Sequence, residues 1–346
     1  MRLGRHIAAV TSVALLAAGL SACGSDDPTD AAPAAGSAAA FPAVIEHKYG
    51  TTTVPAEPKR IVVVGLVEQD ALLALGITPV ATTEWWGEQP GAIWPWAKDE
   101  LGGNPVPQVL KPTDGIEIEK VLALDPDLVL GVYSGMTKEE YEKLSARVPT
   151  VPEPKGVIDF GASWQELTRV VGAAVGKTAE AEKVISDIEA RFAAARQANP
   201  AFADKVAAVV TYYQGIYVYG SQDARGRFLK DLGFRLPDGL DALTGTEFGV
   251  TLSPEKTNLV DTDVLVWLID DYAKDRASIH ANPLYATLKV KSEARDVFLE
   301  NGEVLGAATS FITPLSLPYL LDNLVPQMAT AIDGDPATEV KRAPRQ

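Results

Sequence analysis

One short pattern occurs twice in the chain, and this repeat constrains the fold more than any other feature. Residues 116–130 and residues 252–266 align with a constant offset. Each copy ends in an apolar run, so each predicts a short helix, a tight acidic turn and a buried strand. The alignment pairs the same charged residues in the two copies: Glu119 with Glu255, Lys120 with Lys256, Asp125 with Asp261, and Asp127 with Asp263. We therefore expect two related α/β lobes.

The segments before each copy support the same fold class. Residues 60–65 form an apolar run rich in β-branched residues, which is typical of a strand covered on both faces in a parallel sheet. A short helix over 71–76 and a strand over 78–81 are expected next, and this alternation indicates an α/β fold. A Leu-Gly pair precedes each copy, at residues 75–76 and 232–233. The predicted architecture is two Rossmann-like lobes with a ligand cleft between them.

A long helical stretch separates the two lobes. Ser163 and Glu166 form a capping box at its start, and apolar residues keep helical spacing afterwards. The helix expected over 178–197 would span about 30 Å, and one rigid connector of this kind allows only a modest closure of the lobes. The predicted divisions are a signal peptide at 1–22, a lipidated cysteine and tether at 23–42, an N-terminal lobe at 43–162, a connector at 163–199, a C-terminal lobe at 200–336 and a tail at 337–346.

The first residues predict export and a lipid anchor. Arg2 and Arg5 precede an apolar run, Ile7 to Leu20, which as a helix would span roughly 21 Å and is too short for a typical membrane crossing. It has the size of the apolar part of a secretory signal. The run ends in Leu-Ser-Ala-Cys, which matches a bacterial lipobox, and Cys23 is the only cysteine in the chain. We expect Cys23 to hold the protein at the outer face of the cytoplasmic membrane by lipid alone; the alternative is an ordinary signal with an incidental cysteine.

The charge of the chain argues against one class of partner. The formal net charge is −15, and removal of residues 1–22 takes away two arginines and no acid. An acidic surface repels phosphate backbones, so no nucleic-acid partner is expected.

Lipobox, tether, α/β lobe, long helix and second α/β lobe together resemble the class III substrate-binding proteins of bacterial ABC importers, which bind ferric siderophores, haem or vitamin B12. The resemblance covers nearly all of residues 43–334, and its most specific piece is the duplicated Glu-Lys segment. It implies a monomer in the cell envelope that captures a ferric siderophore and delivers it to an ABC permease. Haem and vitamin B12 stay open as alternative cargoes.

The resemblance also assigns a role to two glutamates. In this family, one glutamate at the start of the repeated helix in each lobe pairs with arginines on a permease subunit. Glu119 and Glu255 occupy those positions, so the resemblance implies that they dock the protein. The alternative is that each carboxylate only favours the positive end of its own helix.

Aromatic and cationic residues gather in the loops that should follow the strands. In open α/β sheets, ligands bind beyond the carboxyl ends of the strands. Aromatic walls with a few cations suit a flat or chelate-rich ligand. The alternatives are that the tyrosines near 213–219 belong to a strand pair and that Trp94 and Trp96 form a packed corner. The predicted ligand-binding residues are Trp85, Trp86, Tyr133, Tyr213, Arg225, Arg227, Trp267 and Phe311.

Other kinds of site lack their residues. The chain has three histidines, and His6 leaves with the signal, so we expect neither a protein-bound metal nor a resident cofactor. Haem stays open as a cargo, with His280 or a tyrosine as its axial ligand. The segment 171–178 fails as a phosphate loop, and 131–135 misses a nucleophile elbow by one position. We therefore expect no enzyme. A cell-surface hydrolase or an interaction lipoprotein on a similar scaffold is the rival from a different class.

Overall fold

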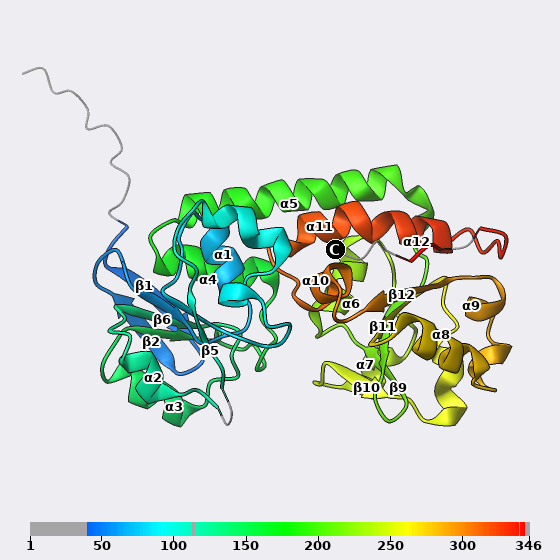
Figure 1. Ribbon diagram of the computed structural model, residues 1–346, viewed down its shortest axis with the longest axis horizontal. Helices are drawn as coiled ribbons and strands as arrows, with labels where there is room; N and C mark the ends of the chain where they lie inside the picture. Colours follow the sequence, from blue (N-terminus) through cyan, green and yellow to red (C-terminus); the bar gives the residue numbers. More distant parts are fainter. Residues whose placement is uncertain (1–39, 113–114, 339, 343–346) are drawn as a thin grey trace, which may run out of the picture. The chain divides into compact units, whose positions relative to one another are not determined.

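A computed structural model describes residues 40–112, 115–338 and 340–342 (Figure 1). The signal peptide and the lipidation site Cys23 lie outside the described residues. None of the described helices is both long and apolar enough to cross a membrane.

The N-terminal lobe contains a five-stranded, fully parallel sheet with the order β5-β4-β3-β6-β7. The strand predicted at 60–65 is confirmed as β3. The strand predicted at 78–81 lies later, at β4, because Pro79 has no N–H to donate to a neighbouring strand. The strands are β3 (Ile61–Val63), β4 (Ala81–Thr83), β5 (Gln108–Leu110), β6 (Leu128–Gly131) and β7 (Thr150–Pro152).

The C-terminal lobe repeats this strand order as β10-β9-β8-β11-β12, so the predicted α/β class with two related lobes is confirmed. The copy differs at β9, which runs antiparallel to β8. Residues 213–215 form a tight connection in which Gln214 and Gly215 have positive φ, and a parallel strand would need a much longer crossover. The strands are β8 (Ala207–Tyr212), β9 (Ile216–Tyr219), β10 (Gly249–Thr251), β11 (Val264–Ile269) and β12 (Asp296–Glu300).

The aspartates of the repeated acidic turns, Asp127 and Asp263, make equivalent hydrogen bonds in the two lobes. A helical segment precedes the turn in each copy: α2 (Ile118–Leu122) and the 3-10 helix η4 (Pro254–Val260). The Asp127 carboxylate accepts hydrogen bonds from the backbone N–H groups of Lys59 and Arg60, at 2.7 and 2.8 Å. Asp263 accepts one from Val206 at 2.9 Å. Each aspartate therefore fixes the start of the first strand of its sheet beside the strand that follows the turn.

The predicted helical connector appears as α4 (Trp164–Ala174) and α5 (Thr178–Ala198). The capping box is confirmed, because the Ser163 hydroxyl accepts a hydrogen bond from the backbone N–H of Glu166 at 3.1 Å. Ala181, near the start of α5, packs in the core of the N-terminal lobe, and Phe192 packs in the core of the C-terminal lobe. Helix α5 therefore extends along both lobes (Figure 1).

The C-terminal helices form a second, noncovalent link between the lobes. Helix α11 packs along α5, while Ala307 in α10 and Phe311 directly after it belong to the core of the N-terminal lobe. These helices are α10 (Val304–Ser310), α11 (Ser316–Asn323) and α12 (Val325–Ala331).

The remaining elements cover the sheets or connect the strands. The helix predicted at 71–76 is confirmed as α1, which begins earlier, at Glu68. The set comprises β1 (Ala43–His47), β2 (Gly50–Val54), α1 (Glu68–Ala74), η1 (Pro90–Ala92), η2 (Pro95–Leu101), α3 (Lys138–Ser145), η3 (Pro200–Phe202), α6 (Ala224–Asp231), α7 (Leu240–Thr244), α8 (Tyr272–Ala281), η5 (Tyr285–Thr287) and α9 (Lys289–Ser292).

Candidate functional site

A hollow of about 470 Å³ lies between the two lobes, and we call it the cleft. This volume is within the range of small-molecule sites, and the lining is predominantly aromatic. The N-terminal lobe contributes Leu66, Trp85, Tyr133 and Phe160, and the C-terminal lobe contributes Thr211, Tyr213, Tyr217, Tyr219, Asp223, Arg225 and Phe248.

Sheet topology explains the position of the N-terminal wall. Connections leave the central pair β3 and β6 toward opposite edges of the sheet, which makes their carboxyl ends a switch point where ligands typically bind. Leu66 follows β3 and Tyr133 follows β6, and the N–H of Leu66 donates to the carbonyl of Tyr133 at 3.1 Å. The prediction that the cleft forms at these strand ends is confirmed.

The opposite wall is built on the β8–β9 hairpin. Along β9, Ile216 and Val218 are buried, while the alternating Tyr217 and Tyr219 are half-buried and line the cleft. Their ring centroids lie 5.2 Å apart. The tyrosines therefore belong both to a strand pair and to the cleft. Tyr213, in the hairpin connection, is 66% exposed.

A buried ion pair stands in this wall. Nη1 of Arg225 lies 3.0 and 2.9 Å from the two carboxylate oxygens of Asp223, and its guanidinium carbon lies 4.1 Å from the centre of the Tyr219 ring. Asp223 also caps α6 by accepting the backbone N–H of Arg225. Burial alone would lower the pKa of Arg225, but the charge of Asp223 raises it. Within the described structure, the buried Nε of Arg225 has no hydrogen-bond partner.

Burial shifts the pKa of two ionisable groups on the N-terminal side of the cleft, Tyr133 in the lining and Glu68 beside it. Burial raises the pKa of the Tyr133 phenol to about 12, and the charge of Asp223 adds to the shift, so the phenol stays neutral at physiological pH. Glu68 is fully buried at the start of α1, and burial raises the pKa of its carboxyl to about 7. Its carboxylate accepts the backbone N–H groups of Tyr133 at 2.8 Å and Val67 at 3.1 Å. Sequence reasoning missed Glu68, whose only signal was an acid in the turn after the first strand.

Of the two predicted tryptophans after β4, Trp85 lines the cleft and Trp86 packs against it. Trp85 is 40% exposed and lines the cleft. Its ring centroid lies 4.1 Å from that of Trp86 and 5.0 Å from that of Phe311. Phe311 is buried and Trp86 is half-buried, so both back Trp85 without lining the cleft themselves. Trp94 and Trp96 stack with centroids 5.2 Å apart, as the packed-corner alternative requires.

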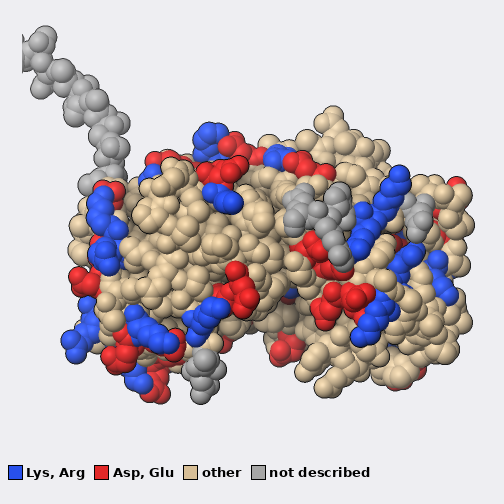
Figure 2. All heavy atoms as spheres, in the orientation of Figure 1, with Lys and Arg blue, Asp and Glu red and all other residues tan. Residues whose placement is uncertain are grey.

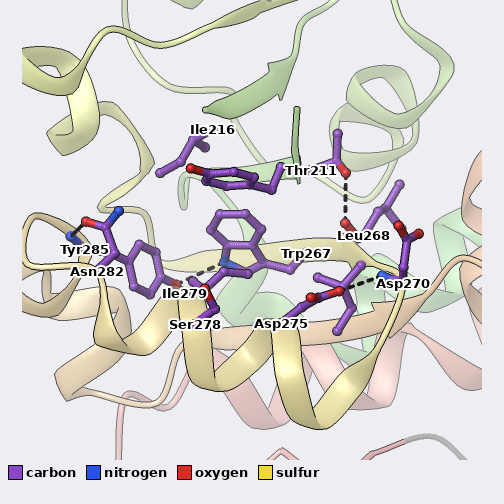
Figure 3. A pocket seen from close by; sticks show the side chains of 12 residues that line it. Thr211, Ile216, Trp267, Leu268, Asp270, Asp275, Ser278, Ile279, Asn282 and Tyr285 are labelled. Atoms are coloured by element: carbon purple, nitrogen blue, oxygen red, sulfur yellow. Dashed lines mark hydrogen bonds between the residues drawn. The ribbon is translucent and has the colours of Figure 1, made fainter. Parts of the chain in front are cut away.

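Two further predicted ligand residues, Trp267 and Arg227, also lie outside the cleft lining. Trp267 is fully buried within β11, because the strand extends to Ile269 instead of ending before the tryptophan. It borders a separate hollow of about 200 Å³ in the C-terminal lobe and donates through Nε1 to the Tyr285 hydroxyl at 3.0 Å (Figure 3). Arg227 is two residues from Arg225 on α6 and therefore faces a different side of the helix. Its Nη2 donates to the carbonyl of Ala162 at 3.5 Å.

The cleft continues into a hollow of about 360 Å³ in the N-terminal lobe, and the two share Leu66 and Phe160. This N-lobe hollow lies at the ends of β3, β4, β5 and β6. Two carboxylates, Glu117 and Glu140, are among its lining residues. The N-terminal lobe therefore adds a second hollow beside the cleft.

The two predicted docking glutamates lie at equivalent, exposed positions. Glu119 is on α2 and Glu255 is on η4, each in the segment before a central strand of its sheet. The Ser253 hydroxyl donates to Glu255 at 2.7 Å, which lowers the pKa of Glu255. On the face drawn in Figure 2, acidic and basic side chains are intermixed.

The described residues contain no cluster of three or more His, Cys, Asp or Glu side chains that could hold a metal ion. His47 is buried against the Thr52 hydroxyl at 3.0 Å. His280 lies 2.7 Å from the carboxylate of Asp296 in the C-terminal lobe and is not among the residues that line the cleft.

Comparison with known proteins places this geometry in context. Residues 61–292 match the family described as Periplasmic binding protein. The probable siderophore-binding lipoprotein YfiY of Bacillus subtilis is 28% identical over 278 residues, which are 79% of this chain and 81% of YfiY. A periplasmic solute binding protein from Mycobacterium smegmatis superposes with a TM-score of 0.74 at 32% identity, over 84% of this chain and 98% of that one. Streptococcus pneumoniae PiaA, solved in complex with ferrichrome, shares the fold with a TM-score of 0.75 at 24% identity, over 84% and 99% of the chains.

Proposed function

Because the chain belongs to the periplasmic binding protein family, we propose that it captures a ferric siderophore outside the cell membrane and delivers it to an ABC permease. The observation that carries this proposal is the cleft, whose two lobes supply aromatic walls and an arginine paired with an aspartate. The cargo is bound noncovalently, as substrate and not as a resident cofactor, and the protein acts as a monomer without catalysis.

The shape and chemistry of the cleft support a chelate as cargo. A ferric siderophore is a compact organic ligand with oxygen atoms around the metal, and the cleft offers ring faces from Trp85 and Tyr217 together with hydroxyl groups from the tyrosines. The cleft and the N-lobe hollow leave enough space for a ligand of that size. The relative YfiY, which is named as a probable siderophore-binding lipoprotein, supports the same assignment.

Delivery would use the paired glutamates. Glu119 and Glu255 are exposed at equivalent positions of the two lobes, so a permease of two subunits could engage both at once. Single exposed charges add little binding energy, but a matched pair steers approach and fixes orientation.

Anchoring would use Cys23, which follows the apolar signal segment. We expect Cys23→Ser to release the protein from the membrane fraction of the native host into the medium or periplasm. Retention of the variant in the membrane fraction would contradict the lipid anchor without affecting the binding proposal.

Tryptophan fluorescence tests the binding function. Trp85 lies at the cleft, so a bound ferric chelate with visible absorption should quench the emission of the protein. Titration with ferric hydroxamates, ferric catecholates, mycobactin-like chelates and haem should give saturable quenching with one of the ferric siderophores, and the iron-free chelator should quench less. Saturable quenching by haem alone would identify haem as the cargo. The absence of saturable quenching with every compound tested would contradict the proposal.

A further inference from the structure

Among the described residues around the cleft, carboxylates outnumber cations. Among the residues that the structure describes, those that line the cleft and the N-lobe hollow include one cation, Arg225. They include three carboxylates, those of Glu117, Glu140 and Asp223. A chelate held in this space therefore meets more negative than positive charge.

The single cation is already neutralised within the wall. Both carboxylate oxygens of Asp223 lie within 3.0 Å of Nη1 of Arg225, and both side chains are almost completely buried. An anionic ligand that approaches Arg225 must also approach the Asp223 carboxylate. Because charges interact strongly where water is excluded, the pair offers an anion little net attraction.

Cations beyond the lining leave the carboxylates around the cleft in excess. Arg227 lies outside the lining residues, where its Nη2 contacts the carbonyl of Ala162, and its charge reaches the Tyr133 phenol. Together with Arg225 it makes two cations against three carboxylates. Lys111 pairs with Glu84 at 3.0 Å, and Lys120 pairs with Glu117 at 2.7 Å. Both lysines are more than half exposed, so solvent screens their charges.

The cleft also keeps hydrogen-bond donors that can bind the oxygen atoms of a chelate. The buried Nε of the Arg225 guanidinium lacks a hydrogen-bond partner among the described residues. The phenol of Tyr133 stays protonated, and Tyr217 and Tyr219 add two more hydroxyl groups. The aromatic rings can also hold a pendant ammonium group by cation–π attraction.

We propose, on the basis of the proposed function, that the cleft selects ferric chelates of neutral or positive net charge and that Asp223 determines this preference. Hydroxamate chelators fit this class, since three hydroxamate groups balance the charge of the ferric ion. Tricatecholate and hydroxycarboxylate complexes keep excess negative charge and are disfavoured.

Three chelates test the proposal on the native protein: neutral ferrichrome, cationic ferrioxamine B and anionic ferric enterobactin. Tryptophan quenching should give dissociation constants for the first two that are at least about tenfold lower than for enterobactin. Added salt should weaken binding of ferrioxamine B and strengthen binding of enterobactin, because screening reduces both the attraction and the repulsion.

The substitution Asp223→Asn tests the assigned residue, since asparagine can still cap α6. It should lower the dissociation constant of ferric enterobactin, relative to those of ferrichrome and ferrioxamine B, by about tenfold. The matched control is Asp322→Asn, which removes one exposed carboxylate on α11, where it pairs with Arg191, and should leave the ratio unchanged. Tightest binding of enterobactin by the native protein, or an unchanged ratio in a folded Asp223→Asn variant, would overturn the proposal. Failure of all three chelates to bind would instead overturn the proposed function itself.

Discussion

The Asp70 carboxylate on α1 accepts a hydrogen bond at 2.5 Å from the hydroxyl of Thr313, which lies 243 residues later, between α10 and α11. The same carboxylate oxygen accepts Nε1 of Trp96 at 2.8 Å. The Thr313 hydroxyl also accepts the backbone N–H of Ser316 at 3.0 Å. This buried network ties the N-terminal lobe to the C-terminal helices at a place distinct from α5.

We predict that Thr313→Val lowers the free energy of unfolding by about 1–3 kcal/mol, because it removes a donor from a buried carboxylate. Urea denaturation measures the change. The control is Thr330→Val on α12, where the hydroxyl bonds only to the carbonyl of Pro326 within its own helix and the expected change is smaller. Equal losses in the two variants would show that the Asp70–Thr313 bond does not stabilise the protein specifically.

The buried Glu68 should make stability depend on pH. Burial raises its pKa in the folded protein from 4.5 to about 7, so folding favours the protonated form. The stabilisation is fully present below about pH 4.5 and is lost as the pH rises through about 7. Burial raises the pKa of Asp70 to about 6, which acts in the same direction.

We predict that Glu68→Gln removes part of this dependence. Relative to the native protein, the variant should gain roughly 3 kcal/mol of stability between acidic and mildly alkaline pH, the equivalent of the pKa shift. Urea denaturation across this pH range gives the two curves. Glu142→Gln, at an exposed site on α3, is the control and should give a curve parallel to that of the native protein. A parallel curve for Glu68→Gln would contradict the pKa assignment.

Trp85→Ala should weaken chelate binding, because the indole is an exposed part of the cleft wall. Loss of one aromatic contact of this size should raise the dissociation constant by about tenfold, as measured by calorimetry. Tyr319→Phe on α11, outside the lining residues, serves as a control that should retain the native affinity. Native affinity in Trp85→Ala would place the chelate elsewhere.

The double substitution Glu119→Ala with Glu255→Ala should reduce iron uptake in the native host while leaving the dissociation constant for the chelate unchanged. Both carboxylates are exposed and neither lines the cleft, so their removal affects docking only. Removal of two other exposed acids, Glu57 and Asp322, controls for net charge and should spare uptake. A large loss of affinity for the chelate in the Glu119 and Glu255 variant would contradict the docking role.

The duplicated segment predicted the fold because its aspartates accept hydrogen bonds from backbone N–H groups. Each copy of the segment needs such partners in its own lobe. Asp127 and Asp263 bind the first residues of equivalent strands, so a repeat in sequence becomes a repeat in strand order. The direction of β9 was not predictable from that repeat. It depends on the short connection at 213–215, which lies outside the duplicated segment.

The site was predicted less completely than the fold. Placing aromatic residues after strands found Trp85, Tyr133 and Tyr213, because chain order fixes which loops meet at the sheet ends. It misplaced Trp267, since the end of β11 depends on its pairing with β8 and β12 and not on local composition. The partner of Arg225 was also missed, because the pairing with Asp223 depends on the burial of both side chains.

Anomalous X-ray scattering at the iron absorption edge, from crystals of the protein grown with ferrichrome, tests the central claim most directly. A bound ferric chelate would place one strong iron peak in the cleft, between the Tyr133 side and the wall that carries Tyr217 and Arg225. An iron peak at another surface, or an empty cleft in crystals that retain the chelate, would contradict the account.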